Sequence, residues 1–253
     1  LNQQNIRMSR NDNKNKITIT PVTTRRMQPP QDDLFSVLAE SFPQINNGEI
    51  VVVTSKVASI HLGLSYDAKT TDKKQLISQE ADYIVESEFD NIWNVTLTEN
   101  TLLPAAGIDA SNANGYYLTL PKQSSLFAEQ VWRWISDRDE VDNFGVLITD
   151  SHSVPLRYGT IGVAIGFYGF EPVYDLKGKK DLFDRELEVS RVNVPDSLAA
   201  SAVYAMGESD ESTPLCIIQG ADQIRFVEHH TYQDFFIPPK DDMYWPLLKK
   251  IYE

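Results

Sequence analysis

Five segments of the chain place apolar residues three or four positions apart, the spacing of one face of a helix. They are residues 34–42, 72–88, 124–140, 195–206 and 244–252. Ser124 or Ser125 is expected to cap the start of the third segment. In the fourth, Pro195 suits the first helical turn and Gly207 suits the position after the last turn. The pattern therefore predicts five helices.

Continuous apolar runs rich in β-branched residues indicate buried strands. Four such runs occupy residues 17–22, 50–55, 144–149 and 215–219. The second of them leads into Lys56 and the third into Asp150. Residues 159–169 carry four glycines among apolar residues, which is typical of a close-packed strand and turn. Helices and strands do not alternate regularly, so an α+β fold class is expected.

Composition narrows the classes of partner. The chain has 253 residues, of which 42% are apolar, and a formal net charge of −13. A negative surface repels phosphates, so neither nucleic acid nor an anionic membrane is an expected partner. No apolar run reaches the roughly 20 residues that cross a bilayer. Together with the single cysteine, Cys216, these features lead us to expect a cytoplasmic protein. Residues 1–16 are polar and Asn-rich and are expected to form a disordered tail, with one domain over residues 17–253.

Three loops carry oxygen-bearing side chains of the kind that hard cations and phosphates prefer. The first is Gly-Ile-Asp-Ala-Ser-Asn at 107–112, which contains Asp109. The second follows the strand at 144–149, where Asp150 and Ser151 are expected at the strand's end. The third is the acidic and hydroxyl-rich loop at 206–214. Each loop alone also fits a turn or a helix cap, and the residues by themselves leave that alternative open.

The order of these loops along the chain resembles one known family. GIDASN, LITDS, RYGTIGVAIGFYGFEPVYDLKGKKD and PDSLAASAVYAMGESDESTP occur in that order, after VVVTSKVAS. Together they resemble the γ-glutamyl ligases of coenzyme F420, from about residue 17 to 222 and most densely between 105 and 215. The family's fold is α+β with mixed and antiparallel sheets and flanking helices.

The resemblance implies an activity and a site. Family members are homodimers that use GTP and two divalent metal ions, Mg²⁺ or Mn²⁺, to join L-glutamate to a small carboxylate acceptor. The implied metal ligands are Asp109, Asp150, Ser151 and Glu208. The implied nucleotide contacts are Lys56, Asn112, Met206, Gly207, Ser209, Asp210, Glu211, Ser212 and Thr213, with residues 21–24 near the same ligand. No separate catalytic residue is singled out.

Some positions depart from the family pattern. Ala105 stands where the family has Asn, Leu62 where it has an acid, and Asp184 where it has Gly. The segment Ser-His-Ser-Val at 151–154 replaces Thr-x-Gly-Arg. Because these changes lie beside the expected acceptor, they indicate a different acceptor or lost activity. The C-terminal segment, from about residue 223, resembles a bacterial subgroup linked to folate-type acceptors.

Three hypotheses follow. The first is an acid–amino-acid ligase that activates a carboxylate as an acyl phosphate; its acceptor resembles either coenzyme F420-0 or folate. The second is a non-catalytic nucleotide- or ligand-binding protein on the same fold, to which the departures point. The third is a structural module in which Asp109 and Asp150 only cap turns.

Overall fold

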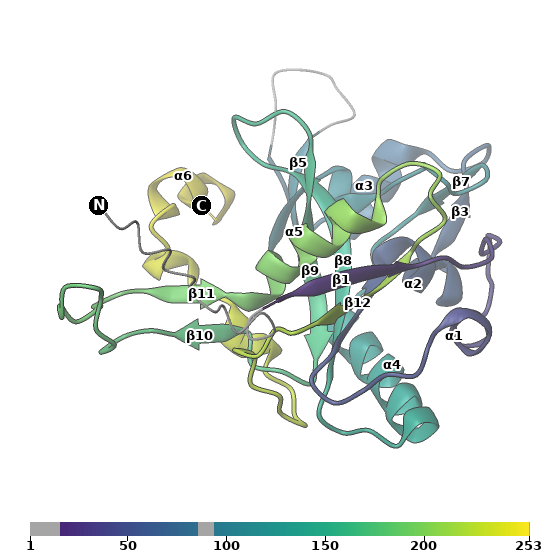
Figure 1. Ribbon diagram of the computed structural model, residues 1–253. Coiled ribbons are helices and arrows are strands. Elements are labelled where there is room, and N and C mark those ends of the chain that lie inside the picture. Colours follow the sequence, from purple (N-terminus) through teal and green to yellow (C-terminus); the bar gives the residue numbers. More distant parts are fainter. Residues whose placement is uncertain (1–15, 86–93, 253) are drawn as a thin grey trace, which may run out of the picture.

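A five-stranded sheet forms the centre of the molecule (Figure 1). The structure is a computed structural model, and it describes residues 16–85 and 94–252. In spatial order the strands are β1 (Thr18–Val22), β12 (Leu215–Gln219), β2 (Ile50–Thr54), β8 (Gly145–Ser153) and β9 (Thr160–Tyr168). Strands β2 and β8 are parallel and the other neighbours are antiparallel. The mixed sheet with separate helices confirms the α+β fold class.

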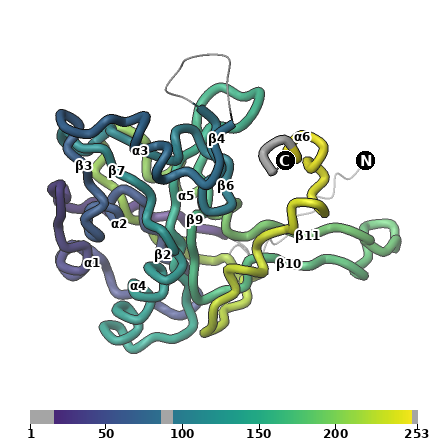
Figure 2. Tube along the Cα trace, turned by 180° about the vertical axis from the view of Figure 1, so that it is seen from behind, coloured from purple at the N-terminus to yellow at the C-terminus, as the bar shows by residue number. Residues whose placement is uncertain are grey.

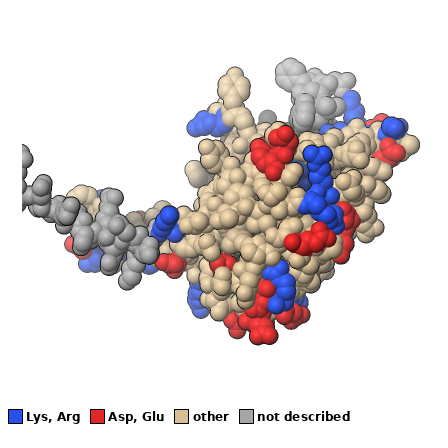
Figure 3. All heavy atoms as spheres, turned by 45° about the vertical axis from the view of Figure 1, so that its right-hand side comes forward, with Lys and Arg blue, Asp and Glu red and all other residues tan. Residues whose placement is uncertain are grey.

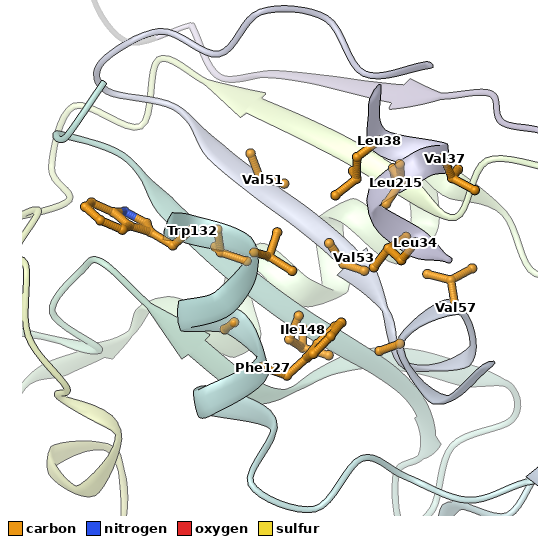
Figure 4. Close-up of a cluster of buried hydrophobic side chains, with 14 of the residues drawn as sticks. Leu34, Val37, Leu38, Val51, Val53, Val57, Phe127, Trp132, Ile148 and Leu215 are labelled. Carbon is orange, nitrogen blue, oxygen red and sulfur yellow. The ribbon is translucent and has the colours of Figure 1, made fainter. Parts of the chain in front are cut away.

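Helices cover both faces of this sheet. Side chains alternate along a strand, so Val51 and Val53 of β2 face one layer while Ile50 and Val52 face the other. The first layer contains α1 (Leu34–Ser41), α2 (Ser55–His61) and α4 (Ser124–Asp139). Figure 4 shows their side chains meeting β2, β8 and β12 in the larger core. The second layer is α5 (Val194–Met206), which packs on the opposite face.

Two glycines of β9 allow these helices to lie close to the sheet. A β-carbon at Gly162 would lie 2.3 Å from the carbonyl oxygen of Ala199 in α5. At Gly166 it would lie 2.4 Å from the backbone of Ser124 in α4. The close-packed strand expected for residues 159–169 is therefore confirmed, and its glycines are the contact points for helices on both sides.

Short elements between α2 and α4 form a lobe that is joined to the larger core through Leu103 and Leu118. They are β3 (Ser65–Asp67), α3 (Lys73–Glu80), β4 (Tyr83–Ile84), β5 (Val95–Thr98), β6 (Thr101–Pro104), the 3-10 helix η1 (Ala105–Gly107) and β7 (Tyr116–Leu118). They form one sheet of three strands, β4-β5-β6, and one of two, β3-β7. The helix predicted for residues 72–88 is wrong in its second half: Asp72 caps α3, which ends at Glu80, because the chain then pairs with β5 as β4. Residues 86–88 lie outside the described residues.

A long hairpin arm and a C-terminal segment complete the fold. Strands β10 (Val173–Asp175) and β11 (Arg191–Asn193) begin an arm that projects away from the body in both views (Figures 1 and 2). The C-terminal segment, which we define as residues 223–252, contains η2 (Tyr232–Phe235), η3 (Pro239–Asp241) and α6 (Trp245–Tyr252). The terminal helix agrees with the prediction for residues 244–252. The predicted tail, 1–16, falls outside the described residues except for Lys16.

Three local predictions need correction. Lys56 lies inside α2, because a helix starts at Ser55 as soon as β2 ends. Asp150 lies within β8 and not at its end, since pairing with β9 continues to Ser153. Neither Ser124 nor Ser125 caps α4; the cap position is Gln123, in a left-handed conformation. No helix in the described part of the chain is long and apolar enough to cross a membrane.

Candidate functional site

One cavity of about 490 Å³ collects most of the side chains expected to bind metal and nucleotide. It lies where β2 passes into α2, where β8 continues beyond the parallel pairing with β2, and under the loop that follows α5. The expected residues that line it are Lys56, Asn112, Asp150, Ser151, Met206, Gly207, Glu208, Ser209, Asp210, Glu211, Ser212 and Thr213. Asp109 is not in the lining, and of the expected residues 21–24 only Thr24 is. Segments separated by more than 150 residues thus meet at one place.

Asp150 supplies a partly buried carboxyl group to this cavity. The hydroxyl of Ser55 donates a hydrogen bond of 2.7 Å to its Oδ1. Burial raises the pKa of Asp150 to about 6, although the Ser55 hydrogen bond and the charge of Lys56 act in the opposite direction. A carboxylate in this environment is favoured when a positive charge lies beside it.

Asp109 reaches the cavity through an ion pair. Its Oδ2 lies 2.9 Å from Nζ of Lys56, on α2. Ser111 donates to Asp109 twice, from its backbone N–H and from its hydroxyl, at 2.8 Å each. Burial opposes ionisation, but Lys56 and Ser111 outweigh it and lower the pKa of Asp109. Asp109 is therefore a charged partner of Lys56 at the rim, and also part of a local Asx turn.

The loop after α5 is tied to the rest of the site by three contacts. The hydroxyl of Ser151 donates a hydrogen bond of 2.6 Å to Oε1 of Glu208. The side-chain amide of Asn112 donates to the carbonyl oxygen of Ser209 at 2.8 Å. The N–H of Thr24, which follows β1, donates to the carbonyl oxygen of Ser212 at 3.0 Å. This loop is therefore held over the ends of β8 and β2. Of the first loop expected at residues 21–24, Thr24 is the residue that lines the cavity.

Sequence reasoning missed several lining residues. Ser55 holds Asp150, and its position beside the expected Lys56 was the available signal. Thr149 has a fully buried hydroxyl with no hydrogen-bond partner among the described residues, and it too faces this cavity. Arg25 lies at the edge, where its guanidinium pairs with Asp32 at 2.7 Å. The Arg-Arg pair between β1 and the proline-rich turn could have indicated it.

The donor set suits a hard divalent cation only in part. Carboxylate and hydroxyl oxygens are the right ligands for Mg²⁺ or Mn²⁺. Within the described residues, however, no group of three or more His, Cys, Asp and Glu side chains is arranged to hold a metal ion. Magnesium is commonly held by one or two carboxylates together with substrate phosphates and water. The arrangement around Asp150 fits that shared mode of binding, in which the substrate completes the ligand set.

Charges on the surface are mixed. Figure 3 shows small acidic and basic groups next to one another on the face in view, separated by neutral residues. This distribution offers no broad basic surface on that face, in keeping with the net charge of −13. An anionic ligand would depend on local donors such as Lys56 and the backbone N–H groups of the loop over the cavity.

Comparison with known proteins assigns the family. A family model described as F420-0:Gamma-glutamyl ligase matches residues 22–220, which is most of the chain. The chain belongs to the F420-0:gamma-glutamyl ligase family. The matched span contains every expected site residue, and it ends before the C-terminal segment. The assignment confirms the prediction that the protein is a ligase enzyme.

Relatives of this F420-0:gamma-glutamyl ligase family member cover most of its length. The Coenzyme F420:L-glutamate ligase of Methanopyrus kandleri is 34% identical over 223 residues, covering 81% of this chain and 87% of the relative. The protein of the same name from Methanothermobacter thermautotrophicus is 33% identical, covering 74% and 81%. That from Methanocaldococcus jannaschii is 35% identical, covering 74% and 80%.

Proposed function

We propose that this ligase couples hydrolysis of a nucleoside triphosphate to the addition of L-glutamate to a small carboxylate acceptor. GTP is the nucleotide that we propose first. The acceptor is coenzyme F420-0 or a folate-like acid. The observation that carries the proposal is the single cavity that brings Lys56 and the loop at 206–213 together with Asp150 and Ser151. Relatives that cover most of the chain are named Coenzyme F420:L-glutamate ligase, which supports glutamate and an F420-type acceptor as substrates.

The reaction needs activation of the acceptor, because a carboxylate does not condense with an amine in water. Transfer of the terminal phosphoryl group to the acceptor carboxylate forms an acyl phosphate and releases the nucleoside diphosphate. The glutamate amine then attacks the carbonyl carbon, phosphate leaves, and the amine loses a proton. Catalysis of this kind depends on positioning and on neutralising charge.

Residues of this chain divide these tasks. The ammonium group of Lys56 supplies a point charge for a phosphate. Backbone N–H groups and hydroxyls of the loop at 207–213, held by Asn112, surround the nucleotide. Asp150, with Asp109 at the rim, and the pair formed by Ser151 and Glu208 would hold up to two divalent cations. Bound cations would reduce the repulsion between phosphate oxygens and the incoming carboxylate.

The decisive experiment measures phosphate release by the purified protein with GTP or ATP, Mg²⁺ or Mn²⁺, L-glutamate and either F420-0 or folate. We expect release only when nucleotide, metal, glutamate and one acceptor are all present, with the glutamylated product seen by mass spectrometry. Calorimetry with nucleotide and metal alone tests nucleotide binding to this cavity separately from turnover. If neither GTP nor ATP binds in the presence of either metal, the proposal fails.

A further inference from the structure

A second cavity, of about 440 Å³, is lined by the residue of β8 that follows those lining the first. Its lining includes Leu97 and Leu102 of the β5–β6 hairpin and Ile161 of β9. Phe235 and Phe236 of the C-terminal segment also line it. Their ring centroids lie 5.3 Å apart in an edge-to-face arrangement. The cavity is therefore mainly apolar and partly aromatic.

His152 lines this cavity and carries a ring nitrogen without a partner among the described residues. Its Nδ1 is buried and has no hydrogen-bond partner among the described residues. Asp196, another polar residue of the lining, is already engaged: it accepts from the N–H of Ala164 at 2.9 Å and from the amide of Asn193 at 2.6 Å. Leaving a buried nitrogen without a partner costs free energy. A bound molecule towards which the His152 ring turns this nitrogen would remove that cost.

The two cavities are adjacent along β8. Asp150 and Ser151 line the first cavity, and His152, the next residue, lines the second. Residues two apart on a strand point to the same face and lie roughly 7 Å apart, so Asp150 and His152 share a face of β8 and a molecule in the second cavity needs an arm of about that length to reach the first. The side chains assigned to the nucleotide already line the first cavity, and a reaction with three substrates needs room for two more.

We infer that the second cavity receives the acceptor, with a flat, uncharged ring system against Phe235 and Phe236 and a hydrogen bond to His152. The acceptor's carboxyl arm then points along β8 towards Asp150. This inference rests on the proposed function. It adds the place where the acceptor binds and the kind of ring that the cavity selects. Aromatic walls favour a planar ring. The carboxylates of Asp196 and Asp242 in the lining disfavour a negative charge on that ring.

The inference also assigns a role to the C-terminal segment. Phe235, Phe236 and Leu248 lie beyond residues 22–220, the span that matches the family, yet they form part of this lining. The ring of Phe235 lies edge-on to Phe167 of β9, at 5.7 Å between centroids, which fixes the segment against the sheet. Acceptor choice is then set partly outside the family span and partly at His152, within the Ser-His-Ser-Val departure.

The test compares His152→Leu, His152→Asn and Leu102→Trp with the wild type and with His229→Leu. Asn places a polar atom close to the position of Nδ1, whereas Leu removes it and Trp at 102 fills the cavity. His229 is exposed and lines neither cavity, so it is the matched control. The readouts are KM for the acceptor probes F420-0 and folate, KM for GTP and glutamate, and the melting temperature.

We expect His152→Leu to raise acceptor KM about tenfold, His152→Asn to restore most of the loss, and Leu102→Trp to act more strongly than either. GTP KM and the melting temperature should stay close to wild type. Unchanged acceptor KM in both His152→Leu and Leu102→Trp would overturn the inference while leaving the proposed function intact. A wild-type protein that binds GTP but turns over neither probe, or that binds no nucleotide, would remove both.

Discussion

In the protein without metal, burial of Asp150 conflicts with ionisation of its carboxyl group. Its side chain is partly buried, and only one hydrogen bond from another side chain, that of Ser55, reaches its carboxyl group within the described residues. The nearby ammonium of Lys56 is already paired with Asp109. The ionised form of Asp150 is thus poorly compensated, which is the situation of a group that functions with a cation beside it.

This conflict predicts how the stability of the metal-free protein changes with pH. Burial raises the pKa of Asp150 from 3.8 to about 6. Asp150 therefore binds a proton more tightly in the folded state than in the unfolded state. The stability that this bound proton contributes is lost as pH rises from about 4 to about 6. Asp150→Asn cannot titrate. Its free energy of unfolding relative to wild type should increase across that window, by up to about 2–3 kcal/mol.

Urea denaturation in EDTA at pH 4, 5, 6 and 8 measures this difference. Ser55→Ala provides a second check, because loss of the Ser55 hydrogen bond should raise the pKa of Asp150 and move the window to higher pH. A difference between Asp150→Asn and wild type that stays constant from pH 4 to 8 would contradict the assignment.

Lys56 gives a second prediction at this scale. Lys56→Met keeps most of the side-chain length but removes the charge that we assign to a phosphate. We expect the dissociation constant for GTP to rise at least tenfold, because charge-assisted hydrogen bonds contribute about 1.5–3 kcal/mol. Calorimetry measures it. Lys122→Met is the control: Lys122 pairs with Glu80 and lies outside the cavity. Equal GTP affinity in both variants would refute the role of Lys56.

At the scale of elements, the contact between β9 and α5 positions the loop over the site. Gly162→Ala would place a methyl group 2.3 Å from the carbonyl oxygen of Ala199, so α5 must move. We expect the free energy of unfolding to fall by about 1–3 kcal/mol, as in other overpacked cores. GTP affinity should fall as well, because the loop at 207–213 continues from α5. Ser201→Ala, on the exposed side of the same helix, should leave both measurements unchanged.

The sequence predicted the long elements well, and the reason is physical. Strands β2, β8, β9 and β12 and helices α4 and α5 bury long apolar faces, which leaves a clear periodicity. In the lobe at 65–118, α3 was predicted in part, but the strands have two to four residues, too short to show a period, and were not predicted. Helix α2 was missed because it starts at Ser55 directly after β2, with no turn residue between the two elements to mark the change.

The composition of the site was predicted better than its geometry. The sequence motifs that resemble the family contain most of the residues that line the first cavity. The contacts that arrange these residues, however, join positions far apart in the chain. Ser55 and Asp150 are 95 residues apart, and Asn112 and Ser209 are 97 apart. Such pairs depend on strand order in the sheet, which periodicity does not specify. The second cavity could not be predicted, since it forms where β8, β9 and α5 meet the short β5–β6 hairpin and the C-terminal segment, and periodicity does not specify such contacts.

For the whole molecule, the β10–β11 arm is the feature that a single chain does not explain. Backbone hydrogen bonds extend the hairpin beyond its strands, from Gly178 to Leu187 and from Asp181 to Arg185. Near its tip Leu182 is 98% exposed and Phe183 84% exposed. An isolated two-stranded hairpin is marginally stable in water, and exposed apolar side chains favour association. We propose that the arm packs against a second copy of the chain, as expected for a homodimer.

The proposal is tested by replacing both apolar residues at the tip. Light scattering after gel filtration should give twice the chain mass for wild type and the single-chain mass for the variant with Leu182→Ser and Phe183→Ser. Glu188→Ser, an exposed polar change on the same arm, should remain dimeric. Because the described residues of one chain complete the first cavity, the monomeric variant should still bind GTP. A wild type that is monomeric throughout the micromolar range would refute the role of the arm, whereas a monomer without GTP binding would show that the partner contributes to the site.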